Sequence, residues 1–119
     1  MTLDVVRAYC LSKPGTSEDF PFDQDTLVIR VMEKIFALLP LENWESGKPS
    51  INLKCDPDYA QELRARYTAV IPGYHMNKKH WNTIHLYESD LPSKLLFELI
   101  DHSYTLIVES LPKSKRELL

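Results

Sequence analysis

The amino-acid sequence predicts a single α+β domain, residues 1–119, with an antiparallel sheet and helices packed on one face of it. Strand-like segments are grouped along the chain and a long amphipathic segment closes it, an arrangement typical of this class. The composition, 44% hydrophobic and 26% charged, is that of an ordinary soluble globular protein. We find no internal repeat and no boundary that separates two domains.

The first helix is expected over residues 2–12. Leu3, Val6 and Cys10 recur at helical spacing, and they follow Thr2, a residue type that caps helices. The run Lys-Pro-Gly that comes next stops the helix.

An acidic loop and a hairpin are expected next. The loop contains two prolines, and its aromatic residues Phe20 and Phe22 are expected to turn back onto the core. β-Branched and aliphatic residues then predict strands at about 26–32 and 35–40, joined by a tight turn. That turn lacks the Asn-Gly signal of the primed turns that usually close a hairpin.

A third strand and a second helix follow. Ile51 and Leu53 alternate with polar residues in the strand at about 50–54, so these two face inward and their neighbours outward. Asp56 as cap, with Pro57 in the first turn, marks the start of the helix.

A last strand and a long closing helix are expected at the end of the chain. In the strand "WNTIHLY", Trp81 is expected in the core, with Thr83 and His85 on its face. Pro92 opens the closing helix, and residues 112–119 are expected to fray. The apolar stripe of that helix is Leu95, Leu96, Leu99, Ile100, Ser103, Ile107, Val108 and Leu111.

Two cysteines, far apart in the sequence, exclude a disulfide framework, so Cys10 and Cys55 are expected to be buried, reduced thiols. No apolar run reaches the roughly 18 residues that a membrane span needs, and the first residues do not resemble a signal peptide. We therefore expect a cytoplasmic protein.

Charge is distributed unevenly. The net charge of −3 argues against a strongly basic nucleic-acid binder. Residues 16–25 hold four acids and no base, whereas residues 63–80 hold four bases and no acid. The molecule is therefore expected to be dipolar.

The basic stretch is the candidate site for binding nucleic acid. Lysine and arginine neutralise phosphates, histidine and asparagine donate hydrogen bonds, and tyrosine stacks on bases. The candidate residues are Lys78, Lys79, Arg64, Arg66, His75, His80, Asn77 and Tyr74. A competing interpretation is that the lysines form a solvated loop tip, the arginines a solvated helix face, and the asparagine only a turn.

No metal, cofactor or catalytic site is predicted. His75, His80 and His85 are five residues apart, a spacing that suits neither a helix face nor alternate strand positions. The sequence has no nucleophile elbow, no phosphate-binding glycine loop and no HExxH, so we do not expect an enzyme. Cys55 precedes a helix N-terminus, where the dipole can lower a thiol pKa.

Five segments carry a resemblance to a known family, in this order along the chain: "KPGTSEDFPF", "MEKIFALL", "INLKCDPDYAQELRARY", "IPGYHMNKKHWNTIHL" and "LPSKLLFELIDHSYTLIVESLPKSKR". By these segments the whole chain resembles the YjbR/MmcQ family. The resemblance implies a fold like that of CyaY, the bacterial frataxin, and DNA binding by a double-wing arrangement of the sheet. It departs at "MEKIF", where family members often carry a glycine before the lysine. Iron binding, which the frataxin likeness suggests, is disfavoured because the first helix offers only Asp4.

The function expected from the sequence is therefore that of a cofactor-free DNA-binding protein with weak, salt-sensitive affinity. The alternative is a protein–protein adaptor that uses the exposed face of the sheet. Oligomeric state is left open.

Overall fold

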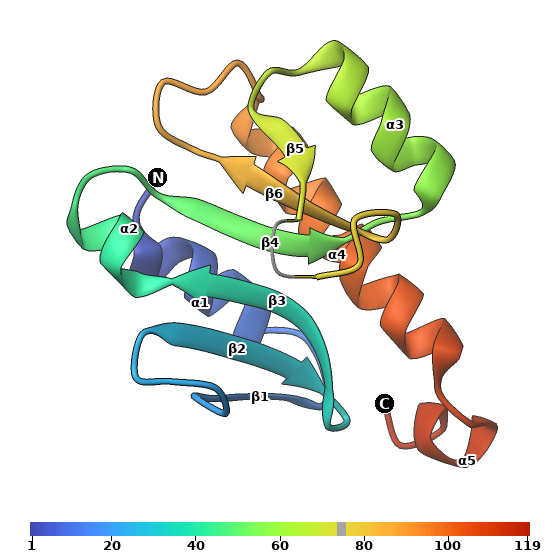
Figure 1. The fold of residues 1–119 in the computed structure, drawn as a ribbon. Coiled ribbons are helices and arrows are strands. Elements are labelled where there is room, and N and C mark those ends of the chain that lie inside the picture. The colour runs from blue at the N-terminus through green and yellow to red at the C-terminus, as the bar shows by residue number, and fades with distance from the viewer. Residues whose placement is uncertain (74–75) are drawn as a thin grey trace.

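A computed structural model describes residues 1–73 and 76–119 of the chain, which form one six-stranded antiparallel sheet with helices around it (Figure 1). The strands lie in the order β1-β2-β3-β4-β6-β5. The elements are α1 (Leu3–Leu11), β1 (Thr16–Asp19), β2 (Thr26–Val31), β3 (Lys34–Pro40), α2 (Leu41–Glu45), β4 (Ser50–Lys54), α3 (Pro57–Arg66), β5 (Val70–Pro72), β6 (Trp81–His85), α4 (Ser93–Ser110) and α5 (Lys113–Arg116).

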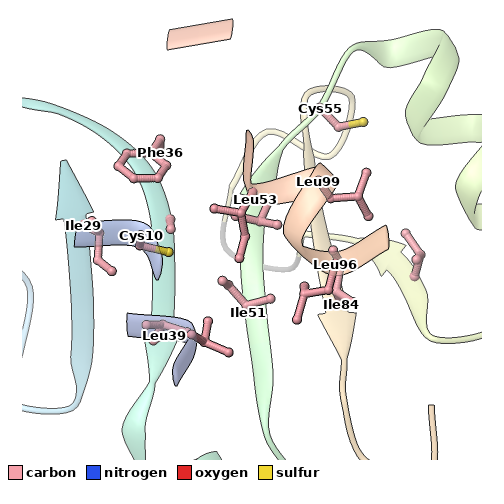
Figure 2. Packing of buried hydrophobic residues seen from close by; sticks show 14 of the residues in the cluster. Cys10, Ile29, Phe36, Leu39, Ile51, Leu53, Cys55, Ile84, Leu96 and Leu99 are labelled. Atoms are coloured by element: carbon pink, nitrogen blue, oxygen red, sulfur yellow. The ribbon is translucent and has the colours of Figure 1, made fainter. Parts of the chain in front are cut away.

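The core lies between the sheet and two helices, α1 and α4, which cover the same face (Figure 1). Leu96 and Leu99 of α4 point at Ile51, Leu53 and Ile84 of the central strands (Figure 2). The predicted α+β class, with helices packed on one face, is confirmed for this central part of the sheet. In residues 1–73 and 76–119, no helix covers the opposite face of β3, β4 and β6, which we call the helix-free face (Figure 1).

A buried serine fastens α4 to the sheet. Ser103, which is fully buried, donates from its hydroxyl to the Phe36 carbonyl of β3 at 2.6 Å and accepts from the Lys54 amide of β4 at 3.0 Å. Because both bonds lie in the interior, they fix the position of the helix along the two strands. The predicted stripe of α4 is confirmed, with Leu96, Ile100 and Ile107 among its buried residues.

The two predicted side-chain caps, Thr2 and Asp56, are also confirmed. The Thr2 hydroxyl accepts a hydrogen bond from the Val5 amide at 3.3 Å, and the Asp56 carboxylate accepts one from the Tyr59 amide at 3.1 Å. Pro57 occupies the first turn of α3, where its missing N–H has no cost.

The segment predicted as a loop with inward aromatics was interpreted wrongly. Thr16–Asp19 form the edge strand β1, paired with β2, and the Asp19 carboxylate binds the Arg30 guanidinium at 3.0 Å. Phe20 and Phe22 follow this edge, and they are 46% and 66% exposed. They do not reach the core because they come after the end of the edge strand β1, where the chain is already at the border of the sheet.

The predicted hairpin is confirmed, and its turn is of the primed kind. Met32 and Glu33 have φ values of 48° and 74°, so two non-glycine residues adopt the left-handed conformation. This geometry matches the twist of the strands. It also explains why a glycine before Lys34 suits this turn.

The last predicted strand is present, but its side chains face the other way. Ile84 lies in the core opposite Ile51, and strand alternation then turns Trp81, Thr83 and His85 to the helix-free face. Trp81 is half-buried and lies outside the core cluster. The prediction placed Trp81 inward because its ring is apolar. The pairing of Ile51 with Ile84 instead determines which side chains of β6 face the core.

Four short elements were missed: β1, described above, and α2, β5 and α5. The last of them contradicts the expected fraying of residues 112–119. Leu111 is buried, and Leu119 is partly buried against the core, with its side chain lying against Gly15. Two leucines that flank a polar stretch therefore fasten this segment to the domain.

Candidate binding surfaces

Arg64 is a structural residue within the predicted nucleic-acid site. Its Nε donates to the Asn82 side-chain oxygen at 2.7 Å, and its Nη2 donates to the carbonyl oxygens of Lys78 at 2.5 Å and Trp81 at 3.2 Å. The side chain is half-buried. The sequence predicted that it lies toward solvent, whereas its guanidinium joins α3 to the turn before β6.

That turn, residues 77–80, presents two lysines. The Asn77 side chain accepts from the Lys79 amide at 2.9 Å, and its carbonyl accepts from the amides of His80 and Trp81 at 3.0 and 2.9 Å. The competing interpretation, that Asn77 terminates a turn in left-handed geometry, is wrong in detail, because Asn77 begins the turn and is not among the residues with a positive φ. Lys78 and Lys79 are both exposed, and among the described residues neither forms an ion pair.

The other predicted site residues are not all gathered with these lysines. Arg66 is exposed and lies over the Tyr67 ring, 5.5 Å from its centroid. It follows Arg64 by two residues, which is roughly 200° around a helix, so the two side chains leave α3 in different directions. His80 is half-buried, and Tyr74 and His75 lie outside the described residues.

A groove of about 750 Å³ lies on the helix-free face of the sheet. Its floor comes from neighbouring residues of three adjacent strands, Leu38, Asn52 and Thr83, which pair in register across the sheet. Phe22 and Met76 also line it. The volume is within the usual range of small-molecule sites.

Polar groups in this groove are oriented by hydrogen bonds. The Thr83 hydroxyl donates to the Asn52 side-chain oxygen at 2.5 Å, and the Asn43 amide donates to the Ser50 hydroxyl at 3.3 Å. In the part of the chain that the structure describes, the Asn52 amide hydrogens and the Ser50 hydroxyl hydrogen have no acceptor. The groove therefore presents hydrogen-bond donors next to the apolar side chains of Leu38, Phe22 and Met76.

Two carboxylates stand at the other side of the groove. Asp23 accepts from the backbone amides of Thr26 at 2.6 Å and Asp25 at 2.9 Å, and these bonds hold its pKa below the usual value. Asp25 accepts from the Glu42 amide at 2.8 Å through one oxygen. No lysine or arginine is among the described residues that line the groove.

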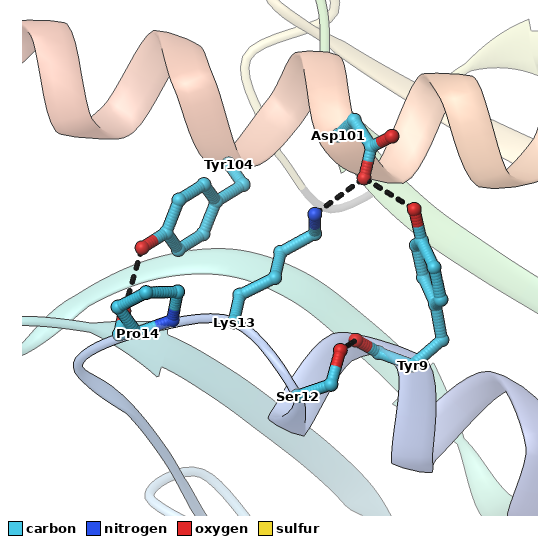
Figure 3. Close-up of polar contacts among 6 residues, drawn as sticks. All are labelled: Tyr9, Ser12, Lys13, Pro14, Asp101 and Tyr104. Atoms are coloured by element: carbon cyan, nitrogen blue, oxygen red, sulfur yellow. Dashed lines mark hydrogen bonds and ion pairs between the residues drawn. The ribbon is translucent and has the colours of Figure 1, made fainter.

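A second polar cluster, around Lys13, is closed on itself (Figure 3). The Lys13 ammonium pairs with Asp101 and lies 5.0 Å and 5.3 Å from the ring centroids of Tyr9 and Tyr104. Tyr104 in turn donates to the Pro14 carbonyl at 2.6 Å. The cluster joins the "KPG" and "DHSY" segments, and we assign it to the attachment of α1 to α4.

Neither thiol is set up for reaction. Both cysteines are buried and free, as predicted. Burial raises the pKa of the Cys55 thiol to about 11 and that of Cys10 to about 12. The suggestion of a lowered Cys55 pKa at the start of α3 is therefore wrong, because burial and the neighbouring Asp56 carboxylate both raise that pKa. Among the described residues, no histidine, cysteine or acid group is arranged to hold a metal ion.

The fold and these surfaces define a small α+β domain whose sheet has one helix-covered face and one open, grooved face. Its family follows from comparison: the family model described as YjbR matches residues 11–106, and the chain belongs to the YjbR family. The sequence resemblance is confirmed in this respect. In the described residues, no helix is both long and apolar enough to cross a membrane.

Similar proteins cover nearly the whole chain. The uncharacterized protein YjbR of Escherichia coli K12 is 36% identical over all of this chain and 98% of its own length. The uncharacterized protein YyaQ of Bacillus subtilis is 31% identical over 89% of this chain and 98% of its own.

Solved structures agree with the fold. The crystal structure of Deinococcus radiodurans protein DR2400 is 36% identical and has a TM-score of 0.85, covering 98% of this chain and 86% of its own. A crystal structure from Pseudomonas syringae is 32% identical, with a TM-score of 0.72, and covers 89% of this chain and 98% of its own.

The groove residues Asn52, Thr83 and Asp25 were not among the predicted site residues. A signal for two of them was present: both "SINLK" and "WNTIH" place polar residues at the strand positions that alternate with core residues. Outward polar residues are common on any half-exposed sheet, so this pattern alone does not indicate a groove.

Proposed function

We propose that this protein is a non-catalytic binding protein and that the open face of its sheet holds the ligand. The observation that supports this most directly is the groove of about 750 Å³ over β3, β4 and β6. An open sheet face is usually polar, whereas this one is hollowed and combines apolar side chains with donors that lack an acceptor in the described residues. The same face would serve the adaptor role considered from the sequence.

The test is to find where small compounds bind. The full chain, labelled with ¹⁵N, is screened by NMR against a library of neutral, cationic and anionic fragments. We expect amide shifts to gather at Thr26, Leu38, Asn52 and Thr83. Asn52→Phe, which places a ring in the groove, is expected to remove them.

Gln61→Phe supplies the matched control, because it adds the same ring to an exposed position of α3 outside the groove. Its spectra are expected to shift with the same compounds as those of the unsubstituted protein. Shifts that gather elsewhere, or the absence of any, contradict the proposal.

Nucleic-acid binding is the second candidate. It is favoured by the hydrogen-bonded turn at residues 77–80, which Arg64 joins to α3 while Lys78 and Lys79 are exposed. Two lysines neutralise few phosphates, so binding is expected to be weak and indifferent to sequence. A frataxin-like architecture and a double-wing mode of binding stay predictions.

Fluorescence anisotropy with a labelled DNA duplex, measured between low and moderate salt, tests this candidate. Replacing Lys78 and Lys79 by alanine is expected to lower the slope of log affinity against log salt by roughly two. The control replaces Lys113 and Lys115 of α5, which removes the same charge. Equal slopes in the two double variants, or no binding at low salt, would count against it.

A further inference from the structure

The groove has a charge preference that follows from its lining. Asp23 and Asp25 border it, the imidazole of His85 from β6 also lines it, and no lysine or arginine does so in the described residues. The two carboxylates outnumber the one histidine. A carboxylate or phosphate group placed there would meet two like charges at partly solvated positions, whereas an ammonium group would be attracted.

Both carboxylates are held in place before any ligand arrives. Asp23 is fixed by the backbone amides of Asp25 and Thr26. One Asp25 oxygen is fixed by the Glu42 amide, and the other has no partner among the described residues. A cation that binds here therefore orders few additional side chains, which lowers the entropic cost of binding.

The rest of the groove suits an organic body rather than a bare ion. Leu38 and Met76 provide apolar contact, and the Phe22 ring is 66% exposed beside the acids. Aromatic faces attract organic cations as well as apolar groups. The Asn52 amide and the Ser50 hydroxyl, 2% exposed as a residue, can donate to an oxygen of the same ligand.

We propose that the groove binds a small organic ammonium compound, with the cation beside Asp23 and Asp25 and an aliphatic or aromatic body across Leu38 toward β6. This inference rests on the proposed function of the groove and adds the chemical class of the ligand. Charge complementarity and the volume of the groove favour a small molecule over an extended basic peptide.

Three compounds that share an indole body test the charge preference: tryptamine as the ammonium, tryptophol as the neutral alcohol and indole-3-acetate as the anion. Binding to the full chain is followed by ¹⁵N NMR titration. We expect tryptamine to bind about fivefold to tenfold more tightly than tryptophol, and indole-3-acetate to bind most weakly. The shifts should fall on groove residues.

The key variant is Asp25→Asn, which keeps the oxygen that accepts from the Glu42 amide and removes the charge. It is expected to abolish most of the advantage of tryptamine and to leave tryptophol binding unchanged. Glu62→Gln is the control, since it removes an exposed acid of α3 and should change neither. Thermal melting confirms that both variants are folded.

The outcomes separate the two proposals. If tryptophol binds in the groove and tryptamine binds no better, the ammonium inference fails and the groove function stands. If neither these three compounds, nor any fragment of the library, nor a tetralysine peptide shifts groove resonances, the groove function fails as well. Binding of a tetralysine peptide there without binding of tryptamine also overturns the inference, because the site would then serve a protein segment.

Discussion

The Tyr9 hydroxyl of α1 donates a hydrogen bond of 2.7 Å to the Asp101 carboxylate of α4, which joins residues 92 positions apart in the sequence. Asp101 also receives the Lys13 ammonium. The two helices that cover the sheet are thus linked to each other as well as to the strands.

Removing this link with Tyr9→Phe is expected to destabilise the protein by about 1–2 kcal/mol at pH 7, as for a hydrogen bond to a charged group. The bond to Asp101, followed by burial, raises the pKa of Tyr9 to about 12. Since an unfolded tyrosine titrates near pH 10, this stabilisation is complete below about pH 10 and is lost as the pH rises to about 12.

Urea unfolding of the unsubstituted protein and of Tyr9→Phe across this range checks the prediction. The difference in unfolding free energy should close between about pH 10 and 12. Tyr87→Phe, at a residue that is 52% exposed, should show no such difference. A difference that stays constant up to pH 12 would show that Asp101 does not hold the Tyr9 proton.

Arg64→Ala and Arg66→Ala are expected to differ sharply although they change the same residue type on the same helix. Loss of Arg64 removes the donor to the buried Asn82 oxygen and to the Lys78 carbonyl, and one of the two donors to the Trp81 carbonyl. It should cost about 2–3 kcal/mol of unfolding free energy. Arg66 is exposed, so its loss should change stability by less than about 0.5 kcal/mol. Denaturant midpoints measure both, and equal costs would be inconsistent with the pinned turn.

Glu33→Gly is expected to stabilise the protein by about 1 kcal/mol, because Glu33 has a φ of 74° and only glycine adopts such an angle without strain. The bond from Arg30 is kept, since it goes to the backbone carbonyl of residue 33. Chemical denaturation gives the comparison. Glu45→Gly in α2 is the control and should destabilise; a lower midpoint for Glu33→Gly would disprove the strain.

Native cysteines should react slowly with a thiol reagent. Burial raises the pKa of Cys55 to about 11, so its thiolate fraction at pH 8 is roughly two orders of magnitude below that of an ordinary thiol. Labelling should accelerate in denaturing urea. An added Lys48→Cys, at an exposed site, should label rapidly in the folded protein. If Cys55 reacts as fast as the thiol introduced by Lys48→Cys, Cys55 is not buried in solution.

Sequence patterns predicted the elements whose own residues determine them. Caps at Thr2 and Asp56, the apolar stripe of α4 and the alternation of Ile51 and Leu53 all depend on neighbours within a few positions. They agree with the structure for that reason.

The wrong predictions concern side-chain orientations that depend on contacts with residues distant in the sequence. The pairing of Ile84 with Ile51 determines the face of the sheet on which Trp81 lies. The turn 14 positions after Arg64 accepts its hydrogen bonds and so determines how far this side chain is exposed to solvent. The groove is a further case, because Leu38, Asn52 and Thr83 become neighbours only through strand order. The spacing of residues within one segment cannot predict contacts between segments that are distant in the sequence.

The two outermost strands also bear on how copies of this protein meet. β5 has three residues and ends in Pro72, which lacks an amide hydrogen, while β1 has four residues and carries Glu18 and Asp19. Short edge strands that are acidic or end in proline pair poorly with the backbone of another chain. Edge-to-edge extension of the sheet, into fibres or into dimers with one continuous sheet, is therefore disfavoured.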